Sequence, residues 1–321
     1  MKNATFLVLI YFLSLNLLFS QEENINNEDL KFYKELIKHF KKNSLNKDSI
    51  DWESFEKKVM GKAKISRDSA IIKALSLNGE EHSSYFKKEQ QTSLYGQYKS
   101  KTLIESINNI GYIKINSFRA SRNSLKETIS KAKIYINKRI ETIKSQDKDN
   151  LKGWVIDLRN NSGGDMWPMI ISLTPFLKDG VLGYTIKNEK ENIWKKENDL
   201  IYYKSINKTK KYLGKDKSLG YNLKNENLKI AILVNERTSS SGEATAIALM
   251  NNQNVKFFGT KSFGYTTNNT SIEMKNGDFL VLTTGIWKNF KREEFKTGII
   301  PDFESANEQE LKKNIENWIN K

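Results

Sequence analysis

The sequence predicts an α/β protein with a small helical cap at its N-terminus. Between residues 30 and 77, apolar side chains recur at spacings of three and four, as they do in amphipathic helices. Two short apolar runs, Trp154–Leu158 and Lys229–Val234, are flanked by turn residues, as expected of buried parallel strands. Each run leads through a turn into a helical pattern, and this strand–turn–helix order indicates the α/β class.

The first twenty residues are interpreted as a secretory signal peptide. Lys2 precedes the apolar run Phe6–Phe19, and Ser20 follows it before a polar stretch. The run is shorter than the roughly 20 residues that a bilayer-spanning helix needs, which favours cleavage after about Ser20 over an uncleaved anchor. No second apolar segment follows. We therefore expect a mature protein without a membrane span, in the periplasm or secreted.

Residues 21–85 are expected to form the helical cap. Its apolar positions fall into three groups, each with helical periodicity, and polar stretches near residues 43–49 and 64–68 separate the groups. The groups are Phe32–Phe40, Phe55–Met60 and Ile71–Leu75. Three helices are therefore predicted.

Residues 86–321 are expected to form the α/β core. The predicted helices are Ser124–Ile143, opened by the capping box Ser124-x-x-Glu127, then Met166–Phe176, Gly242–Met250 and Glu310–Ile319. The predicted strands besides the two apolar runs are Gly111–Phe118 and Phe279–Thr284, the latter after an Asn276-Gly277 hairpin turn. Residues Lys187–Leu228 are rich in Lys and Asn with little periodicity, which indicates a surface excursion bordering the substrate groove.

Composition narrows the classes of function. The chain has no Cys, so an exported form must be stable without disulfides, and with only His39 and His82 a structural zinc site is not expected. No motif for a metal or an organic cofactor is present. The net charge of +15 allows a nucleic acid or an anionic surface as partner, or a solvated surface. Because the lysines are interleaved with Glu, Asp and Asn, we expect no nucleic-acid partner.

Two turns that follow the apolar runs are candidates for chemistry. In the first, Ile156–Asp165, the paired glycines Gly163 and Gly164 can point bare N–H groups at an oxyanion, or only supply the positive φ of a tight turn. In the second, Asn235–Glu243, a serine at a strand-to-helix junction suits a nucleophile at the carboxyl edge of the sheet. However, Ser240-x-x-Glu243 is also a capping box, and spacing alone does not separate the two roles.

His82 lies in a Gly-containing turn between the cap and the core. A serine hydroxyl needs a base of near-neutral pKa, which histidine supplies without perturbation. His39 lies instead inside the first predicted helix beside Lys38 and Lys41, where a solvated surface role is expected.

Together these segments resemble the C-terminal processing, or tail-specific, serine peptidases. That family shows I-D-L-R-x-N-x-G-G, then S-S-G-E, then G-x-x-G-I-x-P-D; the chain has Ile156–Gly164, Ser240–Glu243 and Thr297–Asp302 in the same order, across more than half of its length. The resemblance implies a crotonase/Clp-like spiral of β-β-α units. It also implies Ser240 as nucleophile, with the N–H groups of Ser241 and of Gly163 or Gly164 as the oxyanion hole.

The resemblance also implies which group is the base. Family branches with a Ser-Lys dyad carry a Lys in F-G-K-G, whereas this chain has Tyr265 there, and a phenol with a pKa of about 10 is a poor replacement. The tricorn-like branch, which includes interphotoreceptor-retinoid-binding-like domains, uses a His in D-x-H-S. Glu81-His-Ser83 is similar to that element, with Glu80 at the Asp position, so His82 is the implied general base.

The group that orients the base is left open by the resemblance. Glu294 lies close to the tricorn-like acid but one position out of register, with Phe295 where the acid is expected. Ser83 or Glu243 are alternatives that could orient His82 or its turn. Residues Lys87–Ile110 are too few for an inserted PDZ domain.

The sequence thus predicts a serine peptidase acting on peptides or proteins outside the cytoplasm. Two alternatives stay open: a groove that binds apolar ligands without catalysis, and hydrolysis of an ester or a lipid amide by the same pair. The aromatic residues that could line such a groove, or equally pack in a core, are Trp154, Trp167, Tyr184, Trp194 and Tyr221.

Overall fold

The computed structural model describes residues 25–88, 103–121, 124–214 and 221–321. The chain divides into two compact units. Of the described residues, 25–88 and Ser271–Leu282 form the helical unit, and the others form the α/β unit. The predicted signal peptide lies outside the described residues. Within the described ranges, no helix is long and apolar enough to cross a membrane.

The helical unit contains the three helices that the periodicity predicts. They are α2 (Asn27–Asn43), α3 (Trp52–Ala63) and α4 (Arg67–Leu77). Each begins at a polar N-cap side chain that accepts a hydrogen bond from a first-turn amide; these caps are Asn26, Asp51 and Ser66. Their buried faces, centred on Leu36, Phe40 and Phe55, form one core.

A β-hairpin completes the core of the helical unit. Strand β1 (Ser84–Phe86) pairs antiparallel with the first part of β11 (Phe279–Asn289). The Asn276-Gly277 turn that the sequence predicts connects β10 (Thr267–Glu273) to β11, and the Met274 N–H donates to the Asp278 carbonyl at 2.8 Å. Residues Ser271–Leu282 therefore belong to this unit, although they lie within 86–321 in the sequence.

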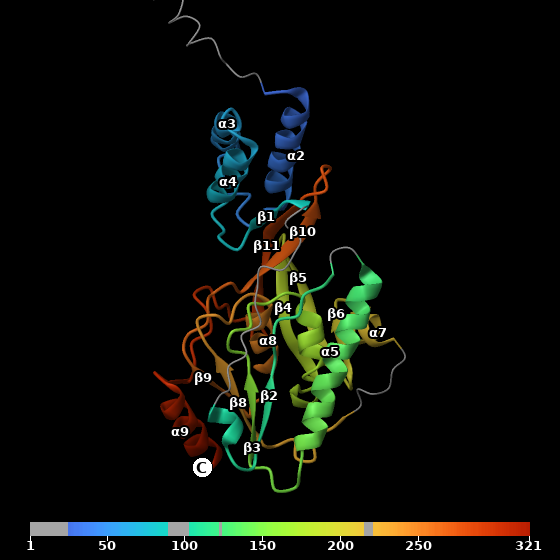
Figure 1. Ribbon diagram of the computed structural model, residues 1–321, viewed down its shortest axis with the longest axis vertical. Coiled ribbons are helices and arrows are strands. Elements are labelled where there is room, and N and C mark those ends of the chain that lie inside the picture. Colours follow the sequence, from blue (N-terminus) through green and yellow to red (C-terminus); the bar gives the residue numbers. More distant parts are fainter. Residues whose placement is uncertain (1–24, 89–102, 122–123, 215–220) are drawn as a thin grey trace, which may run out of the picture. The chain divides into compact units, whose positions relative to one another are not determined.

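The α/β unit is built on a five-stranded parallel sheet in the order β12-β9-β8-β3-β2 (Figure 1). Its strands are β2 (Ile110–Lys114), β3 (Gly153–Asp157), β8 (Lys229–Val234), β9 (Val255–Gly259) and β12 (Phe303–Glu304). The two apolar runs, β3 and β8, are adjacent and parallel as predicted, because Val155 pairs with Ala231. Their carboxyl ends therefore lie side by side.

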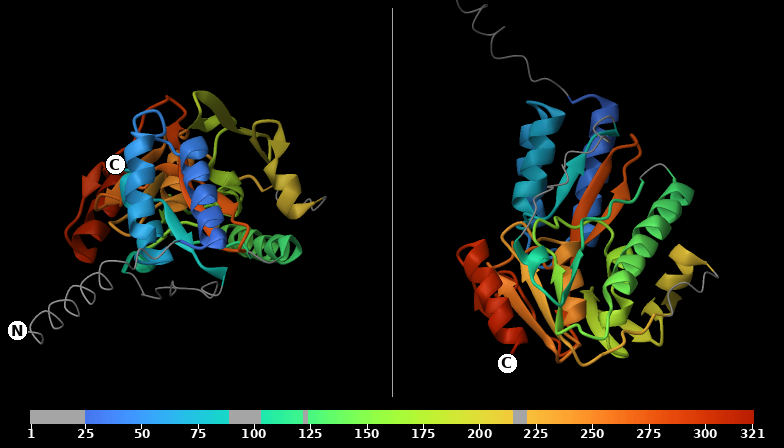
Figure 2. Two further views of the ribbon diagram at one scale, coloured as in Figure 1. Left: turned by 90° about the horizontal axis from the view of Figure 1, so that it is seen from above. Right: turned by 60° about the horizontal axis from the view of Figure 1, so that its bottom comes forward.

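Helices cover both faces of this sheet. Trp154, Ile156 and Ile232 point into a core with helices α5 (Leu125–Gln146), α6 (Met166–Ile171) and α8 (Ser241–Leu249). The alternate residues Val155, Ala231 and Leu233 point into a second core with η2 (Leu103–Ser106) and α9 (Glu308–Ile319). Figures 1 and 2 show α5 and α9 on opposite sides of the sheet. The predicted α/β class is confirmed.

The region Lys187–Leu228, predicted as a surface excursion with little periodicity, contains regular strands and a helix. This region holds β5 (Lys190–Glu197), β6 (Leu200–Tyr203), β7 (Ile206–Asn207) and α7 (Lys208–Leu213), and it continues from η3 (Thr174–Phe176) and β4 (Gly180–Lys187). The strands form an antiparallel meander, and the later part of β11 pairs with β4. In β5 only Asn192 and Trp194 are buried, so exposed lysines hide the alternation of the strand.

The aromatic residues proposed for a ligand groove pack inside the α/β unit. Trp154 and Trp194 are fully buried, and Tyr184 is 5% exposed. Trp167 and Tyr221 are partly buried and pack against the same core. The Trp194 Nε1 donates to Thr185 Oγ1 at 2.8 Å, which satisfies its polar edge within the meander.

Candidate active site

The two turns that the sequence singles out lie together at the carboxyl edge of the parallel sheet. The turn after β3 carries Asn161, Gly163 and Gly164, and the turn after β8 carries Ser240 at the start of α8. Both turns belong to the α/β unit. Ligands bind at this edge in open α/β sheets, so the position suits a reactive side chain.

Ser240 has a backbone conformation that is unusual for its position. Its φ is 53° and its ψ is −125°, values of the first central position of a type II′ turn, where glycine is preferred. Ordinary N-caps such as Asp51 and Ser66 have extended backbones. A non-glycine residue held in such a region costs about 1–3 kcal/mol and is found mostly at functional sites. Sharp strand-to-helix turns of this kind expose nucleophilic serines.

Hydrogen bonds fix the two turns against each other. The Ser239 N–H donates to the Asn161 carbonyl at 3.0 Å, and the Thr238 hydroxyl donates to the Leu158 carbonyl at 3.0 Å. The Ser241 hydroxyl donates to the Gly164 carbonyl at 2.5 Å. The position of Ser240 relative to the glycine turn is therefore set by one backbone hydrogen bond and by two short, buried hydroxyl side chains.

Glycine is required where the turns touch. A Cβ on Gly163 would lie 2.9 Å from the Cβ of Ser240, and a Cβ on Gly164 would lie 1.9 Å from the Phe118 carbonyl oxygen. Both residues also have positive φ, 95° and 115°. The positive φ that the sequence analysis gives as one alternative for this pair is present, and the close approach is a second reason for glycine at both positions.

The amides of this region differ in their partners. The Gly163 N–H donates to the Asn161 side-chain oxygen at 3.0 Å. By contrast, the N–H groups of Gly164 and Ser241 have no acceptor among the described residues. Two unpaired amides beside Ser240, one of them at a helix N-terminus, form a site for negative charge.

Glu243 is fully buried and links Ser240 to a neighbouring loop. One carboxylate oxygen accepts from the Ser240 N–H at 3.0 Å, which is the carboxylate half of the predicted capping box. The other accepts from the Ser262 hydroxyl at 2.5 Å and from the Gly264 N–H at 2.8 Å. Burial raises the pKa of Glu243, and these donors act in the opposite direction by stabilising the carboxylate.

Ser262 is a site residue that the sequence reasoning missed. Its hydroxyl donates to Glu243 and accepts from the Ile299 N–H at 2.7 Å, so it joins α8 to the Thr297–Asp302 element. Tyr265, at the position of the dyad lysine, packs its ring against Phe263 with 4.4 Å between ring centres. The signal for Ser262 was its place directly before that Phe-Gly pair.

His82 lies in the helical unit, in a turn held by polar side chains. The Ser83 N–H donates to the Glu80 carbonyl, and the Asn78 side chain donates to the Ser83 hydroxyl at 3.2 Å. Asn78 in turn accepts from the Ser44 hydroxyl at 2.5 Å. Burial lowers the pKa of His82 to about 4, below the near-neutral value that the sequence analysis expects of the base, so its imidazole is neutral at pH 7.

Glu294 lies in the α/β unit within an ion-pair cluster. Its carboxylate is 2.9 Å from Lys288 Nζ and 3.4 Å from Lys296 Nζ. The hydrogen bond from Lys288 is the main cause of its lowered pKa. Its carboxylate is thus paired with two lysines that also belong to the α/β unit.

Comparison with known proteins agrees with this geometry. The sequence profile of peptidase family S41 matches residues 109–305. The chain belongs to this family, and it is a serine peptidase. The predicted relation to the C-terminal processing peptidases is confirmed.

Of the two relatives described here, one matches most of the chain and the other about half of it. The nisin-resistance protein of Lactococcus lactis is 29% identical over 298 residues, which is 90% of this chain and 86% of that protein. The carboxy-terminal processing protease CtpA of Bacillus subtilis is 29% identical over 182 residues, 56% of this chain but 31% of CtpA. Much of CtpA therefore has no counterpart in the match.

Solved structures share the fold. A lipoprotein from Streptococcus agalactiae superposes with a TM-score of 0.66 at 24% identity, covering 91% of this chain and 96% of that one. The photosystem II D1 C-terminal processing protease gives a TM-score of 0.54 at 14% identity, covering 90% and 97%.

Proposed function

We propose that the protein is an exported peptidase that cleaves peptide bonds through an acyl-enzyme on Ser240. The observation that carries this proposal is the strained backbone of Ser240 at the start of α8, beside two amides that have no acceptor in the described part of the chain. A serine that only capped the helix would have no need of that conformation.

In the proposed reaction His82 is the general base. Its neutral imidazole takes the Ser240 hydroxyl proton while Oγ attacks the scissile carbonyl carbon. The amides of Gly164 and Ser241 donate to the resulting oxyanion. Gly163 supports them through its close packing on Ser240, since its own N–H is bound to Asn161.

The second half of the reaction regenerates the enzyme. The C–N bond breaks as His82 passes its proton to the leaving amine. A water molecule then gives a proton to His82 as it attacks the acyl carbon, and the bond from that carbon to Ser240 Oγ breaks as Oγ takes the proton back. Glu243 holds the Ser240 turn in place through the Ser240 N–H. Ser83 is the neighbour proposed to help orient the His82 turn, and Glu294 is the less favoured orienting group because two lysines engage it.

The test is covalent labelling with a fluorophosphonate, followed by mass spectrometry of tryptic peptides. We expect one adduct, on Ser240, and none in Ser240→Ala. His82→Ala should label much more slowly while it stays folded. Ser239→Ala is the matched control, because only the backbone of Ser239 takes part in the contacts of the turn. Folded protein without an adduct would refute the proposal.

A further inference from the structure

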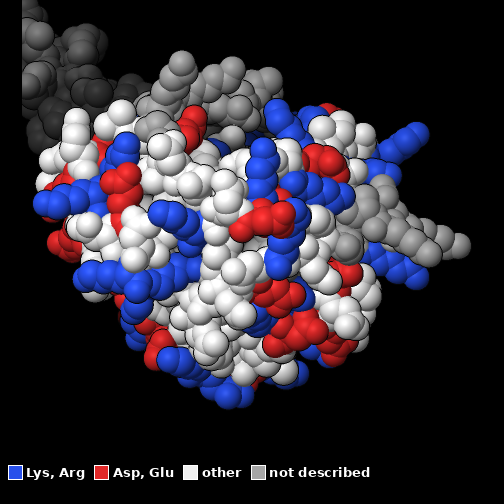
Figure 3. Space-filling view, turned by 90° about the horizontal axis from the view of Figure 1, so that it is seen from below, with Lys and Arg blue, Asp and Glu red and all other residues white. Residues whose placement is uncertain are grey.

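A basic groove lies along the edge of the parallel sheet, between β2 and α5. Its volume is about 930 Å³, and among the described residues that line it Glu105 is the single carboxylate. The cations that line it are Lys114, Arg119, Lys131, Lys138, Arg139 and Arg159. By contrast, positive and negative side chains are interspersed over the face shown in Figure 3. The groove is thus a local concentration of positive charge within a mixed surface.

Two of these cations have no carboxylate partner among the described residues. Lys114 pairs with Asp157 at 3.0 Å, and Lys131 pairs with Glu127 at 2.5 Å. Lys138 and Arg139 have no such pair. Like charges gathered in a concave surface raise the local potential and attract an anion.

Arg139 is held in place for such a contact. Its guanidinium lies 3.2 Å from the centre of the Tyr135 ring, and its Nη1 donates to the Tyr135 carbonyl at 3.0 Å. Tyr135 is fixed in turn, because its hydroxyl donates to the Asn116 carbonyl at 2.6 Å. The Arg139 Nε is buried and has no hydrogen-bond partner among the residues that the structure describes, so the hydrogen-bonding capacity of this cation is incompletely used. A stacked, preorganised guanidinium loses little entropy when it binds a carboxylate.

The backbone of β2 indicates that the anion belongs to a peptide. In the described part of the chain β2 ends the sheet, so one side of it has no partner strand. Gln146 bonds to both the N–H and the carbonyl of Tyr112, which shows that Tyr112 directs its backbone outward. Alternate residues of an edge strand do the same, so Lys114 also offers backbone groups to the groove. An extended peptide can pair with such an edge.

The groove is contiguous with the candidate active site. Asn160 and Ser162 form part of its lining, and Ser162 directly precedes Gly163. The Ser117 hydroxyl, also in the lining, donates to the same Asn161 oxygen that accepts from the Gly163 N–H. A peptide bound in the groove would therefore reach the amides beside Ser240.

We infer that this groove binds an extended, acidic segment of the peptide substrate, with Lys138 and Arg139 as the cations that select it. The inference rests on the proposed peptidase function in naming the ligand a substrate. It assigns a preference for Asp or Glu several residues away from the cleaved bond.

The test measures binding apart from catalysis. Two fluorescent decapeptides that differ only in Glu against Gln are titrated into Ser240→Ala protein, and anisotropy gives the two dissociation constants. Two ion pairs of partly exposed groups should favour the Glu peptide about fivefold to tenfold. The preference should shrink at high salt, because mobile ions screen exposed charges.

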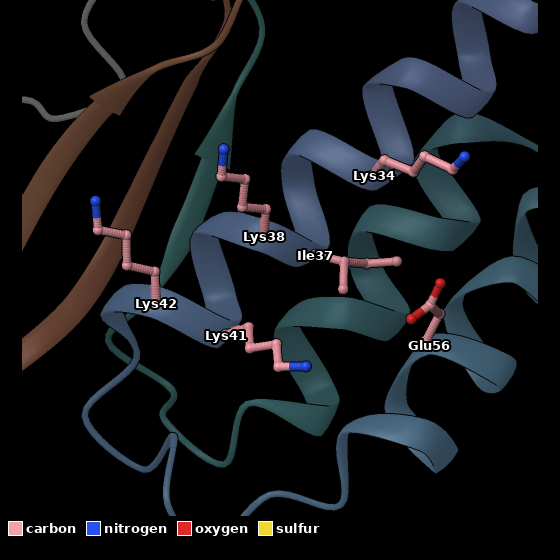
Figure 4. A pocket seen from close by; sticks show the side chains of 6 residues that line it. All are labelled: Lys34, Ile37, Lys38, Lys41, Lys42 and Glu56. Carbon is pink, nitrogen blue, oxygen red and sulfur yellow. The ribbon is translucent and has the colours of Figure 1, made fainter.

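Paired variants locate the effect. Lys138→Gln combined with Arg139→Gln should abolish the preference, and Lys138→Gln alone, at an exposed position, should reduce it without a change in unfolding temperature. The matched control is Lys34→Gln with Lys38→Gln on α2, where lysines surround Ile37 and Glu56 (Figure 4). This control should keep the full preference.

The outcomes separate the inference from the function on which it rests. Equal affinity for the two peptides, or a preference that survives in the groove variants, would overturn the inference. Phosphonate labelling of Ser240 without a charge preference would refute only the groove. A charge preference without labelling would refute only the peptidase proposal.

Discussion

At the scale of single residues, the backbone of Ser240 is strained, and its proposed role as nucleophile accounts for that strain. Its φ of 53° favours glycine, so Ser240→Gly should relieve strain that Ser240→Ala keeps. Both variants should be inactive. We expect Ser240→Gly to be more stable than Ser240→Ala by about 1 kcal/mol, after the greater unfolded-state freedom of glycine is subtracted.

Urea denaturation of the two variants measures this difference directly. If Ser240→Gly were no more stable than Ser240→Ala, the turn would not store strain, and the main support for the nucleophile would be lost.

The pKa of His82 predicts an unusual pH profile. Burial lowers this pKa to about 4, so the imidazole stays neutral, and able to accept a proton, down to about that pH. The kcat/KM for peptide cleavage should therefore hold between pH 5 and 7 and fall only below an apparent pKa of about 4. An ordinary histidine would lose half its activity near pH 6.5.

Initial rates at low substrate concentration, from pH 3.5 to 8, provide the measurement. Circular dichroism at each pH checks that the protein is folded. A half-maximal rate near pH 6.5 would contradict the assigned burial of the base.

At the scale of elements, Glu243 connects the start of α8 to the loop that contains Ser262 and Gly264. In Glu243→Gln an amide NH₂ would face donors that now meet a carboxylate. Leaving such buried donors unpaired costs about 1–3 kcal/mol. We expect the free energy of unfolding to fall by that amount. Protein that is still folded should be labelled by the phosphonate about tenfold more slowly, since about 1.4 kcal/mol in the activation barrier is a factor of ten in rate.

The matched control is Glu141→Gln on α5, whose carboxylate is exposed and pairs with Lys144. Such a surface pair contributes about 1 kcal/mol or less, so stability and labelling should change little. A normal labelling rate in Glu243→Gln would show that Glu243 does not position Ser240.

The spacing of apolar residues predicted the helices and strands in which that spacing is regular. Strands β3 and β8 are buried on both faces, so they read as apolar runs, and α5 begins where Ser124 accepts from the Glu127 amide. The meander was missed because its turns lack the expected glycine signals. Asn188 and Glu189, both with positive φ, connect β4 to β5.

The chemistry of the site was only partly visible in the sequence for a related reason. The contact of Glu243 with Ser262 joins segments 19 residues apart, and no local spacing encodes it. Likewise, the sequence does not distinguish Gly163 from Gly164 as the amide that donates to the oxyanion. Only the geometry shows that Asn161 engages the N–H of Gly163, while the N–H of Gly164 has no acceptor in the described ranges.

At the scale of the whole molecule, the proposed mechanism places its base and its nucleophile in different units. His82 belongs to the helical unit and Ser240 to the α/β unit. The chain passes between the units near Lys88 and within β10 and β11. The proposed mechanism therefore needs one side chain from each unit.

The absence of Cys makes this requirement testable with one substitution. Ser240→Cys introduces the sole thiol of the protein, so alkylation by iodoacetamide reports on that position alone. If His82 meets residue 240, its neutral imidazole assists removal of the thiol proton while the sulfur attacks, and a reaction barrier lower by about 1.4 kcal/mol gives about tenfold faster alkylation at pH 6. Adding His82→Ala should remove this acceleration, whereas His39→Ala, on α2, should keep it. Equal alkylation rates in all three proteins would mean that His82 does not act on this position, and the base would have to be sought elsewhere.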